Sequence, residues 1–207
     1  MNINPTKSKE MHISFAKCTP NLYDITIEGQ PIESVQSCKL LGVTLNNKLT
    51  WHDHIDIIFK KGCQKIHFMT RLKRTKLSTH DLIKVYVTLI RPNLEYACQL
   101  WHGALTDHQC KLLESIQKRA LEIIFPNLSY DEALEIANIN SLWRRRQTLC
   151  SNLFAAIKEP NHKLHKLLPP ISENHYNTRN QSTYNIGITQ SNRFRNTCIN
   201  YCILNDL

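Results

Sequence analysis

The densest group of titratable side chains lies at residues 51–56, which read Trp-His-Asp-His-Ile-Asp. His52 and Asp56 are four residues apart, so on a helix they would face one side and could share a metal ion. His54 and Asp56 also have the His-x-Asp spacing of one half of an iron dioxygenase triad. However, acidic side chains are favoured by the helix dipole in a first helical turn. We therefore interpret the group as the start of a helix and expect no metal site.

The aspartates are spread along the chain, and no two of them are adjacent. They lie at positions 24, 53, 56, 81, 107, 131 and 206. Polymerases transfer phosphoryl groups with two metal ions, which clustered carboxylates must hold close together. The sequence also lacks a glycine-rich phosphate loop and a serine or cysteine nucleophile with a placed base. It therefore predicts no catalytic residue and no cofactor of its own.

The charge of the chain favours a polyanionic partner instead. The sequence has 26 Lys and Arg against 17 Asp and Glu, a formal net charge of +9. Phosphates neutralised by such side chains release counterions, which favours binding to nucleic acid. A basic protein without such a partner is the competing interpretation.

Polar side chains recur along one face of the helix expected after residue 50, in steps of 4, 3, 4 and 3. They are Lys60, Gln64, His67, Arg71 and Arg74. Lys73 widens this surface, and residues 144–146 are three consecutive arginines. A solvated helix face gives the same pattern as a track for phosphates. As nucleic-acid-binding residues we expect Lys60, Arg71, Lys73, Arg74, Arg144, Arg145 and Arg146.

The eight cysteines contain no Cys-x-x-Cys pair. Most of them occupy apolar positions of helical patterns, where a thiol behaves as a small hydrophobe. We expect a reduced intracellular protein, nuclear or cytoplasmic, without disulfides or a zinc site. The sequence shows neither a signal peptide nor an apolar run long enough to span a membrane.

The first fifty residues have the pattern of strands. Alternation of apolar and polar residues predicts strands at 11–15 and 23–27. Glu28-Gly29 then predicts a tight turn, because glycine tolerates a positive φ. Residues 40–45 predict a third strand, which Gly42 interrupts.

Helical periodicity begins after residue 50. Helices are expected at about 50–74, from 78 with a kink or split at Arg91-Pro92, and at about 106–124, 129–137 and 141–158. Capping boxes or close variants precede them at Thr50, Ser78, Thr106 and Ser129. Tyr86, Trp101 and Trp143 are expected in the core. A segment within 199–204 is expected to dock weakly.

The predicted fold class is therefore α+β, a short antiparallel strand region followed by a helical bundle and a flexible polar tail. We place the strand region at 1–48, the helical region at 49–170 and the tail at 171–207.

Several segments occur in an order that characterises one family. They are residues 3–11 (INPTKSKEM), 27–32 (IEGQPI), 39–45 (KLLGVTL), 49–55 (LTWHDHI), 89–97 (LIRPNLEYA) with Trp101, and 116–120 (IQKRA). Together they resemble the C-terminal part of reverse transcriptases from LINE-type, non-LTR retrotransposons. The resemblance covers nearly the whole chain.

The resemblance implies a role for each part of the chain. Residues 1–16 would be the end of the palm, with Lys7 near the incoming nucleotide. Leu41 and Gly42 would form the hairpin that supports the primer end. The helices after residue 50 would be the thumb, which holds an RNA or RNA–DNA duplex. The polymerase aspartates would lie upstream of Met1, so magnesium would belong only to the intact parent, and the missing palm and fingers would be partners. We expect a non-catalytic remnant with low affinity for nucleic acid.

Two alternatives remain beside this interpretation. The region after Trp51 resembles sequence labelled as the N-terminal domain of AlkB-like alkylated-DNA-repair proteins. That label would imply a 2-oxoglutarate-dependent dioxygenase or a methyltransferase, although neither a dioxygenase barrel nor a methyltransferase glycine loop is visible in the sequence. The chain could also be a non-functional pseudogene product, whose unpaired strands would aggregate.

Overall fold

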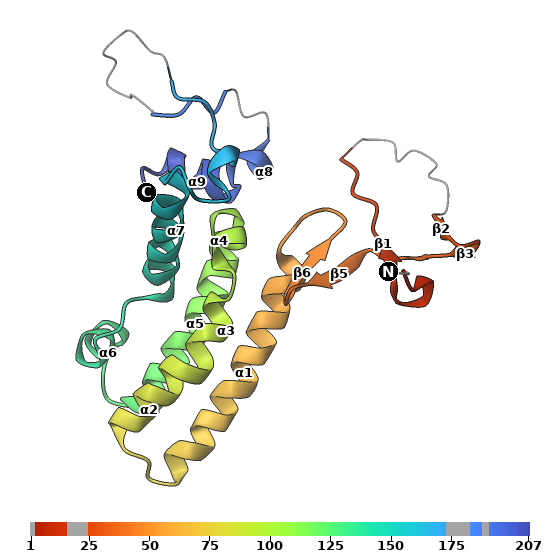
Figure 1. Cartoon of the computed structure of the whole chain (residues 1–207). Helices are drawn as coiled ribbons and strands as arrows, with labels where there is room; N and C mark the ends of the chain where they lie inside the picture. The colour runs from red at the N-terminus through yellow and green to blue at the C-terminus, as the bar shows by residue number, and fades with distance from the viewer. Residues whose placement is uncertain (1–2, 16–24, 173–182, 188–190) are drawn as a thin grey trace. The chain divides into compact units, whose positions relative to one another are not determined.

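The computed structural model describes residues 3–15, 25–172, 183–187 and 191–207. The chain divides into two compact units, Met1–Ile57 and Ile58–Leu207 (Figure 1). The short strands all lie in the first unit, and most of the helices lie in the second. The predicted α+β class is confirmed. The three-part division at residues 48 and 170 stays a prediction.

The first unit contains a short 3-10 helix and three separate pairs of strands. The 3-10 helix η1 is Pro5–Lys7, and the strands are β1 (Lys9–Glu10), β2 (Thr26–Ile27), β3 (Gln30–Pro31), β4 (Glu33–Ser34), β5 (Ser37–Leu40) and β6 (Val43–Asn46). Strands β1 and β4 pair in parallel, whereas β2–β3 and β5–β6 are antiparallel hairpins.

The strand predicted at residues 11–15 is wrong. These residues are not in a strand, and Ile13 and Phe15 are exposed. Alternation is a local signal, whereas a strand also needs a hydrogen-bonded neighbour, and among the described residues β4 pairs with Lys9–Glu10 and not with 11–15. Of the strand predicted at 23–27, Thr26 and Ile27 form β2, and residues 23–24 lie outside the described residues.

A tight turn joins the two strands of each hairpin. In the β2–β3 turn, Glu28 and Gly29 have positive φ values of 51° and 79°, and the tight turn predicted at Glu28-Gly29 is therefore present. Leu41 and Gly42 have φ values of 46° and 86°, so residues 40–45 are not one interrupted strand but the end of β5, a turn and β6. The hairpin implied by the family resemblance is present.

After β6, the regular secondary structure of the described residues consists of helices. Their bounds are α1 His52–Arg74, α2 Thr79–Val85, η2 Tyr86–Ile90, α3 Arg91–Glu95, α4 Cys98–Trp101, η3 His102–Ala104, α5 Asp107–Ile124, α6 Tyr130–Ala137, α7 Leu142–Lys158, η4 His165–Leu167, α8 Asn192–Arg195 and α9 Cys198–Leu204. The kink or split predicted at Arg91-Pro92 is a π-helical distortion rather than a break. The π-helix η2 directly precedes α3, and the backbone stays helical through Ile90 and Arg91.

The helix starts follow the predicted capping chemistry at three of four positions. Thr106 and Ser129 form complete capping boxes, and Ser78 accepts a hydrogen bond from the Asp81 N–H. At the start of α1, the side chain of Asn46 replaces this arrangement. Its Oδ1 accepts from the Thr50 N–H at 2.8 Å, and its Nδ2 donates to Asp53 Oδ2 at 2.9 Å.

The core of the second unit lies between α2–α4, α5 and α7. Tyr86 and Trp101 are fully buried there, as predicted. Trp143 is 46% exposed, so the prediction that it belongs to the core is wrong. Helix α1 reaches this core through Gly62, where an added Cβ would lie 3.2 Å from the Ile116 side chain.

The C-terminal segment expected to dock forms α9. Cys202 and Ile203 of α9 pack with Cys150 and Phe154 of α7 in a small apolar cluster. The C-terminus accordingly lies beside α7 (Figure 1). No helix in the described part of the chain combines the length and the apolar character needed to cross a bilayer.

Candidate nucleic-acid interface

Helix α1 separates apolar and basic side chains onto different faces. Ile58, Ile66 and Met69 are buried, as their helical spacing predicts. The polar side chains that recur every three or four residues are all exposed. These are Lys60, Gln64, His67, Arg71 and Arg74, which we call the α1 basic stripe. Its cations are free to meet an external phosphate.

Lys73 lies beside this stripe and already has a partner within the protein. It is partly buried, and its Nζ donates to the carbonyl of Ile124 at 3.4 Å. Ile124 is the last residue of α5, where the helix dipole favours a positive charge. Lys73 therefore helps to fix α1 against α5, which the residue pattern alone did not indicate.

The three consecutive arginines of α7 have different environments. Consecutive residues of a helix point about 100° apart, so three neighbours cannot share one face. Arg144 is exposed, and Arg145 Nε forms an ion pair with Glu95 Oε1 at 3.2 Å. Arg146 is 0% exposed. The prediction that Arg146 binds nucleic acid is wrong, because no phosphate can reach its guanidinium in this structure.

The burial of Arg146 follows from its position on α7. Leu142, Arg146, Cys150 and Phe154 are spaced by four residues, and all are buried. The guanidinium carbon of Arg146 lies 5.7 Å from the ring centroid of Trp101. Burial lowers the pKa of Arg146 from its ordinary value. The apolar spacing around this arginine was a signal in the sequence that the charge-based interpretation overlooked.

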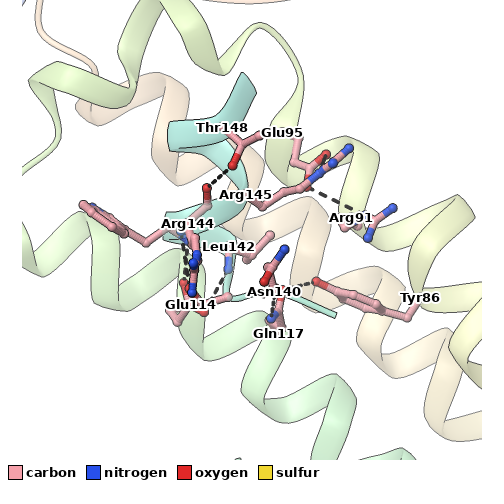
Figure 2. A network of polar contacts seen from close by, with 12 residues as sticks. Tyr86, Arg91, Glu95, Glu114, Gln117, Asn140, Leu142, Arg144, Arg145 and Thr148 are labelled. Atoms are coloured by element: carbon pink, nitrogen blue, oxygen red, sulfur yellow. Dashed lines mark hydrogen bonds and ion pairs between the residues drawn. The ribbon is translucent and has the colours of Figure 1, made fainter. Parts of the chain in front are cut away.

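A polar network holds the start of α7 against α5 (Figure 2). The carboxylate of Glu114, on α5, accepts hydrogen bonds from the backbone N–H of Leu142 at 3.0 Å and of Trp143 at 3.2 Å. It also accepts from the Tyr130 hydroxyl. A carboxylate at a helix N-terminus is favoured by the dipole and satisfies free N–H groups. Glu114 thus positions the segment that carries the arginines.

Gln117 extends this network one helical turn further along α5 (Figure 2). Its Oε1 accepts from the buried Tyr86 hydroxyl at 2.5 Å, and its Nε2 donates to the Asn140 carbonyl at 3.0 Å. Burial raises the pKa of Tyr86 above its ordinary range, so the hydroxyl stays protonated. Sequence reasoning missed both Glu114 and Gln117. Their spacing of three on α5 placed them on one face, but nothing in the sequence named their partners.

The residues that the resemblance assigned to the nucleotide and the primer belong to the first unit. Lys7 is exposed at the end of η1. Leu41 is 85% exposed at the tip of the β5–β6 hairpin, beside Gly42. The α1 basic stripe belongs to the second unit. The proposed roles of Lys7, Leu41 and Gly42 stay predictions.

Within the titratable group at residues 52–56, His54 has a structural role. His54 is buried, and its Nδ1 accepts from the Thr44 N–H at 3.2 Å. His52 and Asp56 are exposed. Within the described ranges, no three His, Cys, Asp or Glu side chains are grouped so that they could hold a metal ion.

The sequence is similar to RNA-directed DNA polymerases of mobile elements. It is 29% identical over 126 residues to the probable RNA-directed DNA polymerase from transposon X-element of Drosophila melanogaster, which is 60% of this chain and 14% of the relative. It is 30% identical over 113 residues to the enzyme from mobile element jockey of the same organism, covering 54% of this chain and 12% of the relative. A similar protein from transposon BS is 23% identical over 126 residues, 60% of this chain and 14% of the relative.

These homologues are polymerases of non-LTR retrotransposons, which confirms the resemblance to LINE-type reverse transcriptases. The chain spans only 12% to 14% of the length of these relatives. No protein-family model matches the sequence, and no solved structure matches it. The AlkB-like label therefore has no support from these comparisons.

Proposed function

We propose that this chain is a non-catalytic remnant of a retrotransposon reverse transcriptase that binds an RNA or RNA–DNA duplex weakly through the α1 basic stripe. The observation that carries the proposal is the exposure of Lys60, Arg71 and Arg74 along one side of a single helix. The similarity to RNA-directed DNA polymerases supports nucleic acid as the partner.

The dimensions of the stripe suit a nucleic-acid backbone. From Lys60 to Arg74 the helix rises by about 21 Å, at about 1.5 Å per residue. Phosphates of one strand follow each other at about 3.4 Å along the helix axis, so the stripe spans about six of them. Contacts of this kind position a duplex without reading its sequence. Three cations can neutralise only a few phosphates, which accounts for a low affinity.

The proposal that the chain alone does not extend a primer rests on its carboxylates. None of the seven aspartates is adjacent to another, whereas a two-metal site needs clustered acidic ligands. In the parent enzyme, the palm would supply these ligands and so hold the magnesium ions. The chain would then contribute only contacts that bind the duplex.

Salt dependence of binding tests the proposal. The variant Lys60→Gln, Arg71→Gln, Arg74→Gln removes three stripe cations, and Lys111→Gln, Lys163→Gln, Lys166→Gln removes three exposed cations outside α1. Fluorescence anisotropy would measure the affinity for a labelled RNA–DNA duplex at several salt concentrations.

The stripe variant should lose affinity and reduce the slope of log affinity against log salt by about 3, close to one per lost phosphate contact. The matched variant should keep the slope within about 1 of that of the unchanged chain. Equal slopes for the two variants would refute binding at the stripe. An affinity of the unchanged chain that is insensitive to salt would refute phosphate binding altogether.

A further inference from the structure

Arg146 is a buried cation whose guanidinium meets no hydrogen-bond acceptor among the residues that the structure describes. Its Nε, Nη1 and Nη2 atoms are all buried, and none has an oxygen or nitrogen partner among the described residues. Its guanidinium carbon lies 5.7 Å from the centroid of the Trp101 ring. An aromatic face satisfies a guanidinium poorly, since burying a charge is costly unless it is paired and hydrogen-bonded.

The carboxylates that influence Arg146 electrostatically are committed to other donors (Figure 2). Glu95 forms ion pairs with Arg145 at 3.2 Å and with Arg91 at 3.7 Å. Glu114 accepts from the N-terminal N–H groups of α7 and from Tyr130. Neither carboxylate has a hydrogen bond to Arg146 in the described part of the chain.

A second buried donor, His102, directly follows Trp101, whose ring Arg146 contacts, and packs against Trp143 on the same helix as Arg146. His102 is 4% exposed, and within the described residues neither of its ring nitrogens has a hydrogen-bond partner. Its ring contacts Trp143 and Tyr201 edge-on, with centroids 6.2 Å and 5.6 Å away. Burial and the charge of Arg146 lower the pKa of His102 to about 4, so at neutral pH the ring is uncharged and carries one N–H.

Among the described residues, this interior therefore holds buried donors without acceptors and a positive charge without a paired carboxylate. Buried polar groups without partners are rare, and a bound ion or water is a recognised reason for them. We propose that the protein binds a small monovalent anion, such as chloride, between Arg146 and His102. The anion would accept hydrogen bonds from the guanidinium and the imidazole, and would neutralise the buried charge.

The surroundings restrict this site to a small ion. Helix α9 covers the histidine, and Tyr201 packs so tightly on Gly103 that an added Cβ would lie 2.6 Å from the tyrosine ring. Arg146 itself has 0% exposure. A phosphate ester would have to displace a helix to reach it, whereas a halide needs little space. The site is thus separate from the exposed stripe that would hold nucleic acid.

Thermal unfolding of the full chain tests the site. The melting temperature would be measured in sodium chloride, sodium bromide and sodium gluconate at equal ionic strength. Arg146→Met removes the buried charge with similar volume, and Arg144→Met removes an exposed charge from the same helix. The unchanged chain and Arg144→Met should melt about 3 °C higher in saturating chloride or bromide than in gluconate. Arg146→Met should show no such difference.

A melting temperature that does not depend on the anion would overturn the proposal, because water alone would then satisfy the donors. Equal anion effects in both variants would also overturn it. If Arg146→Met does not fold, chloride-35 NMR can test the anion site in the variant Lys60→Gln, Arg71→Gln, Arg74→Gln, which keeps Arg146 and lacks three exposed cations. The site would be supported if the protein broadens the chloride signal and added bromide removes this broadening saturably. The absence of such broadening would refute the site.

Discussion

The α1 basic stripe and the arginine triplet of α7 present similar charge in the sequence but have different environments. The members of the stripe are spaced by three or four residues, so its cations Lys60, Arg71 and Arg74 are all exposed on one face. The triplet places three cations in consecutive positions, and the helix points them in different directions. One arginine is exposed, one is paired with Glu95, and one is buried. Spacing, rather than the amount of charge, decides which cations can meet a ligand.

If the α7 region is a structural element, its buried groups should dominate stability. The largest expected effect concerns His102. The folded chain keeps this ring neutral down to about pH 4, whereas the unfolded chain takes up a proton near pH 6.5. The stability that His102 contributes is fully present above pH 6.5 and is lost as the pH falls toward 4. At 1.36 kcal/mol per pKa unit the loss amounts to about 3 kcal/mol.

Chemical denaturation between pH 4 and 7, in chloride-free buffer, would measure this loss. The variant His102→Gln should lack this part of the pH dependence, since it has no titrating ring. Trp143→Phe changes a neighbour of His102 but removes no titrating group, so it should keep the dependence. Identical pH profiles for His102→Gln and the unchanged chain would contradict the burial of a neutral histidine.

The next effect concerns Glu114, which fixes the N-terminus of α7. Glu114→Ala would leave the N–H groups of Leu142 and Trp143 and the hydroxyl of Tyr130 without this acceptor. We expect a loss of about 2 kcal/mol in the free energy of unfolding, because unsatisfied donors near a core are costly. Urea denaturation would measure it. Glu122→Ala breaks only an exposed pair with Arg119 and should cost less than about 0.5 kcal/mol.

The smallest effect separates the two regions directly. Arg145→Gln breaks the ion pair with Glu95 and should cost roughly 0.5–1 kcal/mol of stability, with little change in duplex binding. Arg71→Gln removes an exposed stripe cation, so it should leave stability within about 0.5 kcal/mol and weaken binding. Denaturation and anisotropy on both variants would establish the pattern. The assignment of roles would be contradicted if Arg145→Gln weakened duplex binding and Arg71→Gln lowered stability instead.

Local sequence signals predicted much of the fold. The capping boxes at Thr106 and Ser129 form within one helical turn, so the neighbouring residues alone are enough to predict them. The same holds for the turn at Glu28-Gly29. The prediction of a strand at residues 11–15 was wrong because a strand forms only with a hydrogen-bonded partner that is distant in the sequence.

The candidate site divides in the same way. The exposure of the α1 basic stripe follows from helical periodicity, and its spacing predicted it. The position of Arg146 depends on the apolar spacing shared by Leu142 and Cys150, which charge counting ignored. The pairing of Arg145 with Glu95 joins residues 50 positions apart. No local pattern could have indicated that contact.

Lysine footprinting tests most directly whether the α1 basic stripe is the nucleic-acid interface. The full chain would be methylated reductively with and without an RNA–DNA duplex, and each lysine would be quantified by mass spectrometry. Lys60 should react more slowly in the presence of the duplex, on the order of threefold, because a phosphate contact shields its amine. Exposed lysines outside α1, Lys111 and Lys163, should react at unchanged rates. Equal protection of all three lysines, or none at Lys60, would contradict the proposal.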